Sequence, residues 1–216
     1  MKKIITIILL SVSILSVDAQ VDKLAGPRVG VTMVQAGSLA SILRKDVSLF
    51  SDDIREEWTG STGKYGATMS QYGWQWESRF LDGGDVVGLV EWIALVGGME
   101  KGMFLPSVSS MVGLRTASGF EFAAGPNLSL GGIAMVIGIG KTLKFGKLNV
   151  PVNIAYVPSM DKTYNHSGEY YEEFVDPDGI ENSGDEYWAG FEDEGYSVTH
   201  PTGARISVMV GFNLGK

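Results

Sequence analysis

Strict alternation of apolar and other residues marks the region from position 205 to position 214. Every second position carries a bulky apolar residue: Ile206, Val208, Val210, Phe212 and Leu214. The positions between them are mostly smaller or polar: Arg205, Ser207, Met209, Gly211 and Asn213. Successive side chains of a β-strand point to opposite faces, so one face of this segment is apolar and the other is more polar. The pattern predicts a strand that separates two different environments.

The same alternation, interrupted by turn residues, predicts eight strands. Their expected ranges are 27–36, 67–81, 86–97, 102–116, 119–129, 132–144, 147–158 and 202–214. An even number of antiparallel strands can close on itself and leave no backbone edge unpaired, which a lipid environment requires. The predicted fold is therefore all-β, an eight-stranded antiparallel up-and-down transmembrane β-barrel with two long exterior loops.

The connections between these strands fall into two groups that an up-and-down barrel places at opposite ends. The second, fourth and sixth connections, at 82–85, 117–118 and 145–146, are tight and contain glycine or serine. The two long connections, about 37–66 and 159–201, are the first and the seventh and therefore share one end. Outer-membrane barrels have short periplasmic turns and longer loops outside. We expect both long connections at the cell exterior.

Two strands separate the barrel surface from its lumen most clearly. In strand 67–81 the residues expected to face outward are Tyr72, Trp74, Trp76 and Phe80, and those expected to face inward are Gln71, Gly73, Gln75, Glu77 and Arg79. In strand 147–158 the expected outward residues are Leu148, Val150, Val152, Ile154 and Tyr156. Outward aromatic residues suit the interfacial girdles of a membrane barrel. The strands at 27–36, 86–97 and 132–144 are mostly apolar on both faces, which leaves their register open.

The first nineteen residues have the features of a secretory signal. Lys2 and Lys3 precede an apolar run at 4–17, which is short for the roughly 20 apolar residues that a membrane-spanning helix needs. We expect a signal peptide at 1–19 that is cleaved on export in a Gram-negative cell. The remaining 20–216 is expected to form a single β-barrel domain located in the outer membrane.

Composition supports this location and excludes some partners. The chain contains no cysteine, so it has neither a disulfide framework nor a cysteine for lipid attachment. Without residues 1–19 it carries 15 basic and 24 acidic residues, a net charge of −9. This balance disfavours nucleic acid and anionic lipid headgroups as partners. Only 19% of the residues are charged, which is few for an acidic soluble domain and typical of strands with an apolar outer surface.

Charged residues at inward positions are expected to fill the lumen as a salt-bridge network. They are three acids and three bases: Glu77, Arg79, Glu91, Arg115, Glu121 and Arg205. Arg115 and Glu121 flank a tight turn and would face each other across a hairpin. Glu91 would lie between Arg79 and Arg115. Buried charges persist only when they are paired, and eight strands enclose little more than their own side chains. A charge-lined pore or proton path is the alternative interpretation.

The connection at 159–201 holds most of the negative charge, with twelve acidic residues against one base, Lys162. Clustered carboxylates offer the hard oxygens that Ca²⁺ takes, and the candidate ligands are Asp176, Asp178, Glu181, Asp185 and Glu186. Aromatic residues typical of protein interfaces lie among them: Tyr170, Tyr171, Tyr187, Trp188, Phe191 and Tyr196. The spacing matches no EF-hand loop. A solvated acidic loop, a protein-binding loop and a Ca²⁺ site are therefore the three interpretations, and no other cofactor is expected.

The first long connection contains a predicted short helix. Ser51 is placed to cap it, and Ile54 and Trp58 would share one of its faces. We expect this helix to pack over the mouth of the barrel. Docking of a partner protein on the same helix is the alternative.

Catalytic residues are scarce in this sequence. Its two histidines, His166 and His200, both fall in the acidic connection, where Ser167 and Glu169 follow the first of them. Neither a G-x-S-x-G motif nor a metal-ligand pattern surrounds them. We expect a protein that is not an enzyme, with a hydrolase at the barrel rim as the alternative.

Three segments share a distinctive order of aromatic, glycine and charged residues: MSQYGWQWE at 69–77, GLRTASGFE at 113–121 and GPN at 125–127. Through them the region 67–158 resembles small outer-membrane β-barrel proteins of the Bacteroidota. The resemblance implies a fold and a location, and it brings no catalytic residues.

The expected function follows from the barrel and its exterior connections. We expect contact with outer-membrane lipid, and recognition or assembly with a membrane partner through the acidic segment 159–201. A narrow porin-like transport channel is one alternative. A soluble lipocalin-like ligand binder, in which the apolar stripes would line a cavity, is another.

Overall fold

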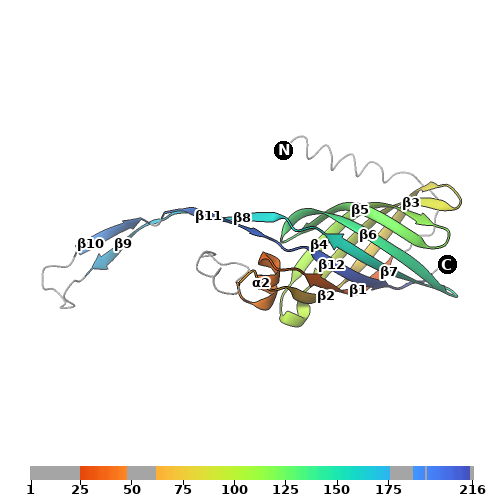
Figure 1. Cartoon of the computed structure of the whole chain (residues 1–216), viewed down its shortest axis with the longest axis horizontal. Helices are drawn as coiled ribbons and strands as arrows, with labels where there is room; N and C mark the ends of the chain where they lie inside the picture. The colour runs from red at the N-terminus through yellow and green to blue at the C-terminus, as the bar shows by residue number, and fades with distance from the viewer. Residues whose placement is uncertain (1–24, 48–61, 176–186, 193, 215–216) are drawn as a thin grey trace.

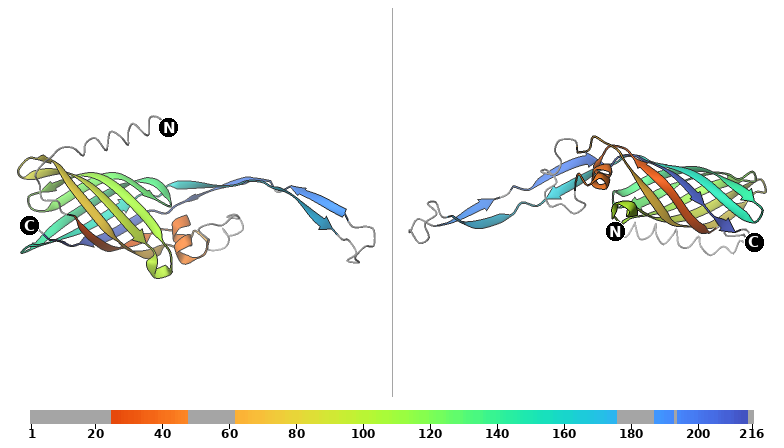
Figure 2. Two further views of the ribbon diagram at one scale, coloured as in Figure 1. Left: turned by 180° about the vertical axis from the view of Figure 1, so that it is seen from behind. Right: turned by 90° about the horizontal axis from the view of Figure 1, so that it is seen from below.

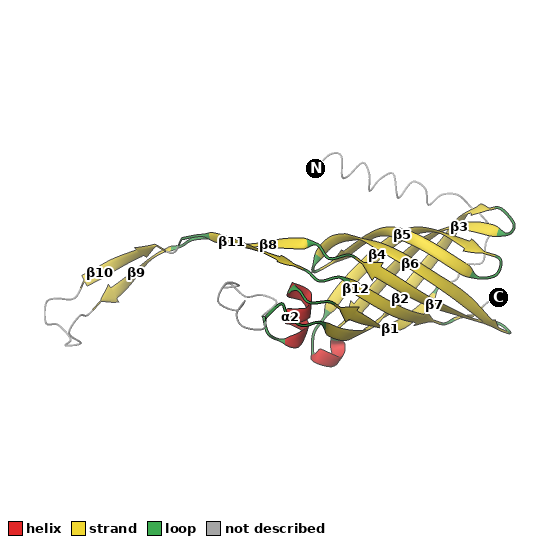
Figure 3. Cartoon of the chain, viewed as in Figure 1, coloured by secondary structure: helices red, strands yellow, loops and turns green. Residues whose placement is uncertain are grey.

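The alternating segments form strands that close into a barrel, and a long two-stranded ribbon projects from one end of it (Figure 1). This computed structural model describes residues 25–47, 62–175, 187–192 and 194–214. Strands make up nearly all of its regular structure, and the few helical residues lie where the ribbon leaves the barrel (Figure 3). Among the described residues no helix is long and apolar enough to cross a membrane.

The barrel strands follow the predicted ranges closely. They are β1 (Gly26–Val34), β2 (Ala67–Asp82), β3 (Val86–Gly97), β4 (Leu105–Thr116), β5 (Phe120–Ser129), β6 (Gly132–Phe145), β7 (Leu148–Val157), β12 (Arg205–Gly211) and β13 (Asn213–Leu214). Each strand pairs antiparallel with the next along the chain, and β12 closes the ring by pairing with both β1 and β7. After Phe212, β13 continues the last strand along β7. The predicted eight-stranded antiparallel barrel is confirmed.

Side chains alternate between the outside and the lumen as the sequence predicts. On β2, Trp74 and Trp76 are 43% and 48% exposed, whereas Gln75 and Glu77 are each 2% exposed. The structure also fixes the register of β1, where Val31 faces outward and Arg28 is buried in the lumen. The apolar stripes therefore lie on the outer surface. The lipocalin-like alternative required them to line a cavity instead.

Tight turns connect the strands at the end of the barrel opposite the ribbon. They lie at 83–85, 117–119 and 146–147, and Gly119 and Gly146 have φ angles of 87° and 59°. L-residues with a side chain rarely adopt this left-handed conformation, so glycine is required for such short connections. At the ribbon end the connections are the 3₁₀ helix η2 (Met99–Lys101), the two residues after β5, and the two long segments.

A short helix, α2 (Ser38–Arg44), packs over the rim of the barrel at the ribbon end. Its apolar residues join the ends of β1, β2 and β4 in one buried cluster: Val34, Leu39, Ala40, Leu43, Met69 and Leu105. The backbone N–H of Leu39 donates to the carbonyl of Thr202 at 3.3 Å, which ties the helix to the base of the ribbon. The helix expected around Ser51–Trp58 lies outside the described residues.

The acidic segment expected as a loop instead forms the ribbon. It contains β8 (Asp161–His166) paired with β11 (Tyr196–Pro201), and β9 (Tyr170–Val175) paired with β10 (Tyr187–Glu192). Threonine, valine and aromatic residues occupy these strands, and their β propensity and cross-strand contacts outweigh the acidic content. From position 161 to position 175 an extended chain reaches about 50 Å. Both views in Figure 2 show the ribbon leading away from the barrel.

Inward glycines let neighbouring barrel strands approach closely, and we predict that Gly125→Ala destabilises the barrel. A Cβ at this buried position would lie 1.9 Å from the carbonyl oxygen of Ser110 on β4. Overpacking of this kind costs about 1–3 kcal/mol. Urea unfolding of the refolded protein, followed by tryptophan fluorescence, measures the loss. The control Gly131→Ala should be neutral, because its nearest neighbour would be 3.6 Å away. Equal stability of both variants would contradict the prediction.

Candidate functional site

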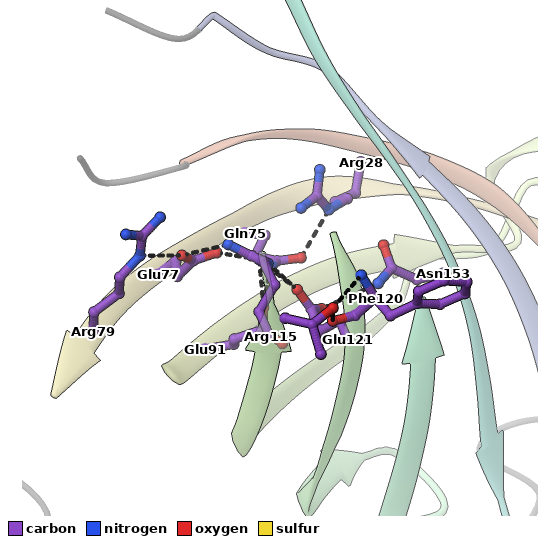
Figure 4. Close-up of polar contacts among 10 residues, drawn as sticks. Arg28, Gln75, Glu77, Arg79, Glu91, Arg115, Phe120, Glu121 and Asn153 are labelled. Carbon is purple, nitrogen blue, oxygen red and sulfur yellow. Dashed lines mark hydrogen bonds and ion pairs between the residues drawn. The ribbon is translucent and has the colours of Figure 1, made fainter. Parts of the chain in front are cut away.

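Arg115 lies at the centre of a charged cluster that crosses the lumen (Figure 4). Its guanidinium binds Glu77 with two parallel hydrogen bonds, Nη1 to Oε1 at 2.8 Å and Nη2 to Oε2 at 2.5 Å. Its Nε donates to Oε2 of Glu121 at 2.6 Å, and its Nη2 lies 3.7 Å from Oε1 of Glu91. One cation therefore serves three carboxylates from β2, β3 and β5. Bidentate arginine–carboxylate contacts of this kind are among the strongest hydrogen bonds in proteins.

Amide side chains extend the cluster to both sides of Arg115. Gln75 donates from Nε2 to Glu91 at 2.6 Å and accepts at Oε1 from Nε of Arg28 at 2.8 Å. On the other side, Nδ2 of Asn153 donates to Oε1 of Glu121 at 3.3 Å. We call this set the charged layer: Arg28, Gln75, Glu77, Arg79, Glu91, Arg115, Glu121 and Asn153. It draws side chains from β1, β2, β3, β4, β5 and β7.

The two remaining barrel strands contribute glycines next to the layer. A Cβ on Gly211 of β12 would lie 1.4 Å from Nη1 of Arg28. A Cβ on Gly140 of β6 would lie 2.2 Å from Nδ2 of Asn153. Each glycine thus leaves the space that a large polar side chain of the layer occupies. Only the full ring of strands makes this packing possible.

Most of the predicted lumen residues meet, but the prediction is wrong in two contacts. Arg205 does not join the carboxylates; it donates to Ser129 and Asn127, both at 3.2 Å, nearer the ribbon end. Glu91 lies near Arg115, as expected, but forms no ion pair with Arg79. It pairs in register with Glu77, and Arg79 forms its ion pair with Glu77 at 3.9 Å. The β-bulge between Arg79 and Leu81 shifts this part of β2 relative to β3.

Arg28 is the functional residue that the sequence analysis missed. It takes the place expected for Arg205, so the layer still contains three acids and three bases. The alternation in β1 gave no clear register, because Gly26, Gly30 and Val34 share the inward face with Arg28. Glu91 is expected to face inward because the apolar residue next to it, Trp92, faces outward. Arg28 also lies between apolar residues, Pro27 and Val29, so the same pattern predicts an inward position for it.

The carboxylates of the layer also have a spacing that a metal ion could bridge. Glu77, Glu91 and Glu121 each bring one oxygen within 4.8 Å of the others. Arg115 already supplies positive charge among them, with hydrogen bonds to Glu77 and Glu121. Removal of this cation would leave the carboxylates buried without their partner. The contacts of the described residues are those of a structural ion cluster.

A small cavity of about 80 Å³ adjoins the charged layer on its ribbon side. Its polar wall includes Thr32, Gln71 and Asn127, where the Thr32 hydroxyl bonds Gln71 and Ser207, and Asn127 donates to Ser109 at 2.9 Å. Its apolar lining includes Met111, Ala123 and Val136. This volume suits a few water molecules. It is far smaller than the several hundred cubic ångströms of typical ligand pockets.

The ribbon carries the other residues singled out in the sequence. His166 pairs in register with Tyr196 and His200 with Lys162, which separates the histidines by four positions, about 13 Å along the ribbon. Burial lowers the pKa of the His200 imidazole. The register thus places the two histidines at separate positions along the ribbon. The Ca²⁺ candidates Asp176, Asp178, Glu181, Asp185 and Glu186 lie outside the described residues.

The sequence matches no protein-family model, and searches of curated proteins and of solved structures gave no significant match.

We predict that Arg115→Met strongly destabilises the barrel. The variant leaves Glu77, Glu91 and Glu121 buried without their shared cation, and removing one partner of a buried ion pair costs about 3–5 kcal/mol. Urea unfolding monitored by tryptophan fluorescence provides the measurement. Adding Glu77→Gln should recover part of the loss, because it removes one uncompensated charge.

Arg79→Met is the matched control for the Arg115 variant. The Arg79 side chain is 24% exposed and its closest approach to Glu77 is 3.9 Å, so the loss should be below about 1 kcal/mol. A loss for Arg115→Met as small as that of the control would refute the central role of Arg115.

Proposed function

We propose that this protein is a non-enzymatic outer-membrane β-barrel that anchors a long exterior ribbon for recognition of, or assembly with, a partner. The observation that carries the proposal is the combination of an apolar outer surface with a lumen crossed by the charged layer. In this arrangement the barrel serves as a fixed support, and the ribbon provides the surface available for binding.

The outer surface of the barrel is apolar over most strands. Side chains that are about 40% or more exposed there include Val29, Val31, Trp74, Val108, Val112, Leu114, Phe122, Leu128, Met135, Ile137, Ile139, Ile154 and Val208. Such a continuous surface is far larger than the apolar patches that soluble monomers expose. The 12 residues of β4 span about 40 Å, or about 30 Å along the axis at the tilt of an eight-stranded barrel. This height matches the hydrocarbon core of a bilayer.

The charged layer argues against transport as the main function. Its side chains come from six strands and bond to one another across the lumen, with Arg115 at the centre. An eight-stranded barrel is just wide enough for its own side chains. Ions would have to disrupt this network in order to pass. We therefore rank the narrow channel below the anchoring function.

Export and family remain parts of the proposal. The expected signal peptide at 1–19 lies outside the described residues, and its sequence supports secretion. Placing the tight turns in the periplasm puts the ribbon and α2 at the cell exterior. The likeness of 67–158 to small outer-membrane proteins of the Bacteroidota agrees with an outer-membrane location.

Cell fractionation combined with gel migration tests the location. We expect the protein to be enriched in the outer membrane and to migrate differently in unboiled and boiled samples, because a closed barrel resists detergent until it is heated. A shortened protein, with 161–201 replaced by a glycine–serine turn, should behave in the same way, since the ribbon lies outside the ring of strands.

Two outcomes would contradict this part of the proposal. Recovery of the protein in the soluble periplasmic fraction would exclude a membrane barrel. Steady ion conductance of the purified protein in planar lipid bilayers would favour the porin-like alternative, whereas a flat trace agrees with the sealed lumen.

Ile137→Arg tests whether the apolar surface faces lipid. Ile137 is 45% exposed near the middle of β6, so a barrel in water would tolerate the change to within about 0.5 kcal/mol. In a bilayer, arginine near the midplane costs about 2–4 kcal/mol. We expect the larger loss in unfolding titrations from phospholipid vesicles. Leu130→Arg, in a connection at the rim and 43% exposed, is the control and should cost about 1 kcal/mol or less.

A further inference from the structure

The outer half of the ribbon, β9 with β10, exposes aromatic side chains on both of its faces. Tyr170, Tyr171, Phe174, Tyr187, Trp188 and Phe191 are between 40% and 68% exposed. Two strands form only one layer, and none of the other described elements covers either face. An isolated two-stranded ribbon is marginally stable in water, and large exposed rings are typical of binding surfaces. The exposed rings of β9 and β10 therefore have the features of a binding surface for another molecule.

The rings are arranged in cross-strand pairs, one on each face. Phe174 pairs in register with Trp188, and their ring centroids are 5.4 Å apart in an edge-to-face arrangement. Tyr171 pairs with Phe191 on the opposite face, with stacked rings 5.6 Å apart. Because residues next to each other along a strand point to opposite faces, each pair serves one face alone. The ring positions are therefore set before any partner binds.

A carboxylate lies beside each ring pair and opposite a small residue. Glu172 pairs in register with Gly190, and Glu173 pairs with Ala189. Glu172 shares its face with Phe174 and Trp188, two positions along the ribbon, and Glu173 shares its face with the other ring pair. Both glutamate side chains on β9 are exposed. On the Glu172 face the Tyr170 ring lies over Gly190, and its hydroxyl donates to Glu172 at 3.4 Å. Each face thus presents an exposed acidic group bordered by aromatic rings.

Charge decides what class of molecule fits this surface. The segment 159–201 has twelve acidic residues and one basic residue, so a second copy of the chain, nucleic acid and anionic lipid are all repelled. Arginine and lysine bind carboxylates and also stack over aromatic rings. A cationic side chain on either face can make both contacts at once. The surface therefore complements a basic polypeptide.

We propose that the β9–β10 ribbon binds an arginine- and lysine-rich polypeptide, with cationic side chains docking over Glu172 on one face and Glu173 on the other, each between aromatic rings. The inference rests on the proposed function and specifies its partner class. It also explains why aromatic and acidic residues are combined in one exposed ribbon. Either residue type alone would give weaker and less specific binding.

Binding of fluorescent octa-arginine to the full-length protein in detergent micelles, measured by anisotropy, tests the proposal. The double variant Glu172→Gln/Glu173→Gln should weaken binding by about tenfold, because it removes both acidic contacts and keeps the rings. The double variant Phe174→Leu/Trp188→Leu should weaken binding by about fivefold. It keeps an apolar pair across the two strands but removes the aromatic rings on which a cationic side chain stacks. An uncharged octapeptide of glycine and serine should not bind.

A matched control separates a built site from general attraction. Glu169→Gln/Glu194→Gln removes the same charge from the ribbon outside β9 and β10 and should weaken binding less than about threefold. Equal effects of the two glutamate variants, or no effect of the leucine variant, would overturn the proposed site. A heat-modifiable membrane barrel that does not bind octa-arginine would refute this inference alone. Binding by a protein that fails the membrane tests would instead refute the proposed membrane location and leave this site in place.

Discussion

Closure of the backbone hydrogen-bond ring is the constraint on which the rest of this structure depends. β12 pairs with β1 on one side and with β7 on the other, so no barrel strand keeps a free edge. A closed ring of eight strands has a narrow interior, so a large inward side chain needs a small residue on a neighbouring strand. Gly211 beside Arg28 and Gly140 beside Asn153 show this limit directly. The outer face has no such limit on size, and bulky apolar residues accumulate there.

Arg115 resolves a conflict that the narrow lumen creates. Three buried glutamates in one layer would repel one another, and each would lose much of its hydration. A single guanidinium with five donors in one plane can satisfy several of them at once, which an ammonium group could not do with the same geometry. Gln75 and Arg28 then carry the hydrogen bonding from Glu91 to the first strand. The layer joins strands that are distant in sequence and so reinforces the ring from inside.

The sequence predicted the barrel well because strand alternation and turn residues are local signals. The eight strands, the tight turns and the inward position of Glu77 and Glu91 all follow from such patterns. The errors arose where the outcome depends on three-dimensional packing. Arg205 and Arg28 are both inward-facing arginines, and only their height along the barrel decides which of them reaches the carboxylates. The ribbon was missed because its acidic residues suggested a solvated loop, whereas cross-strand pairs such as Phe174 with Trp188 become visible only once the register is known.

The contact between Arg115 and Glu121 has a consequence for the order in which the molecule is assembled. These residues are six positions apart and belong to one hairpin, so their ion pair needs only a short chain closure to form. Arg28 is separated from Gln75 by 47 positions, because the first long connection lies between β1 and β2, so their contact needs a much longer chain closure. A hairpin that neutralises its own arginine early would enter an apolar environment at a lower electrostatic cost than a bare charge. The charged layer thus combines a contact that needs only local chain closure with contacts that bring distant parts of the chain together.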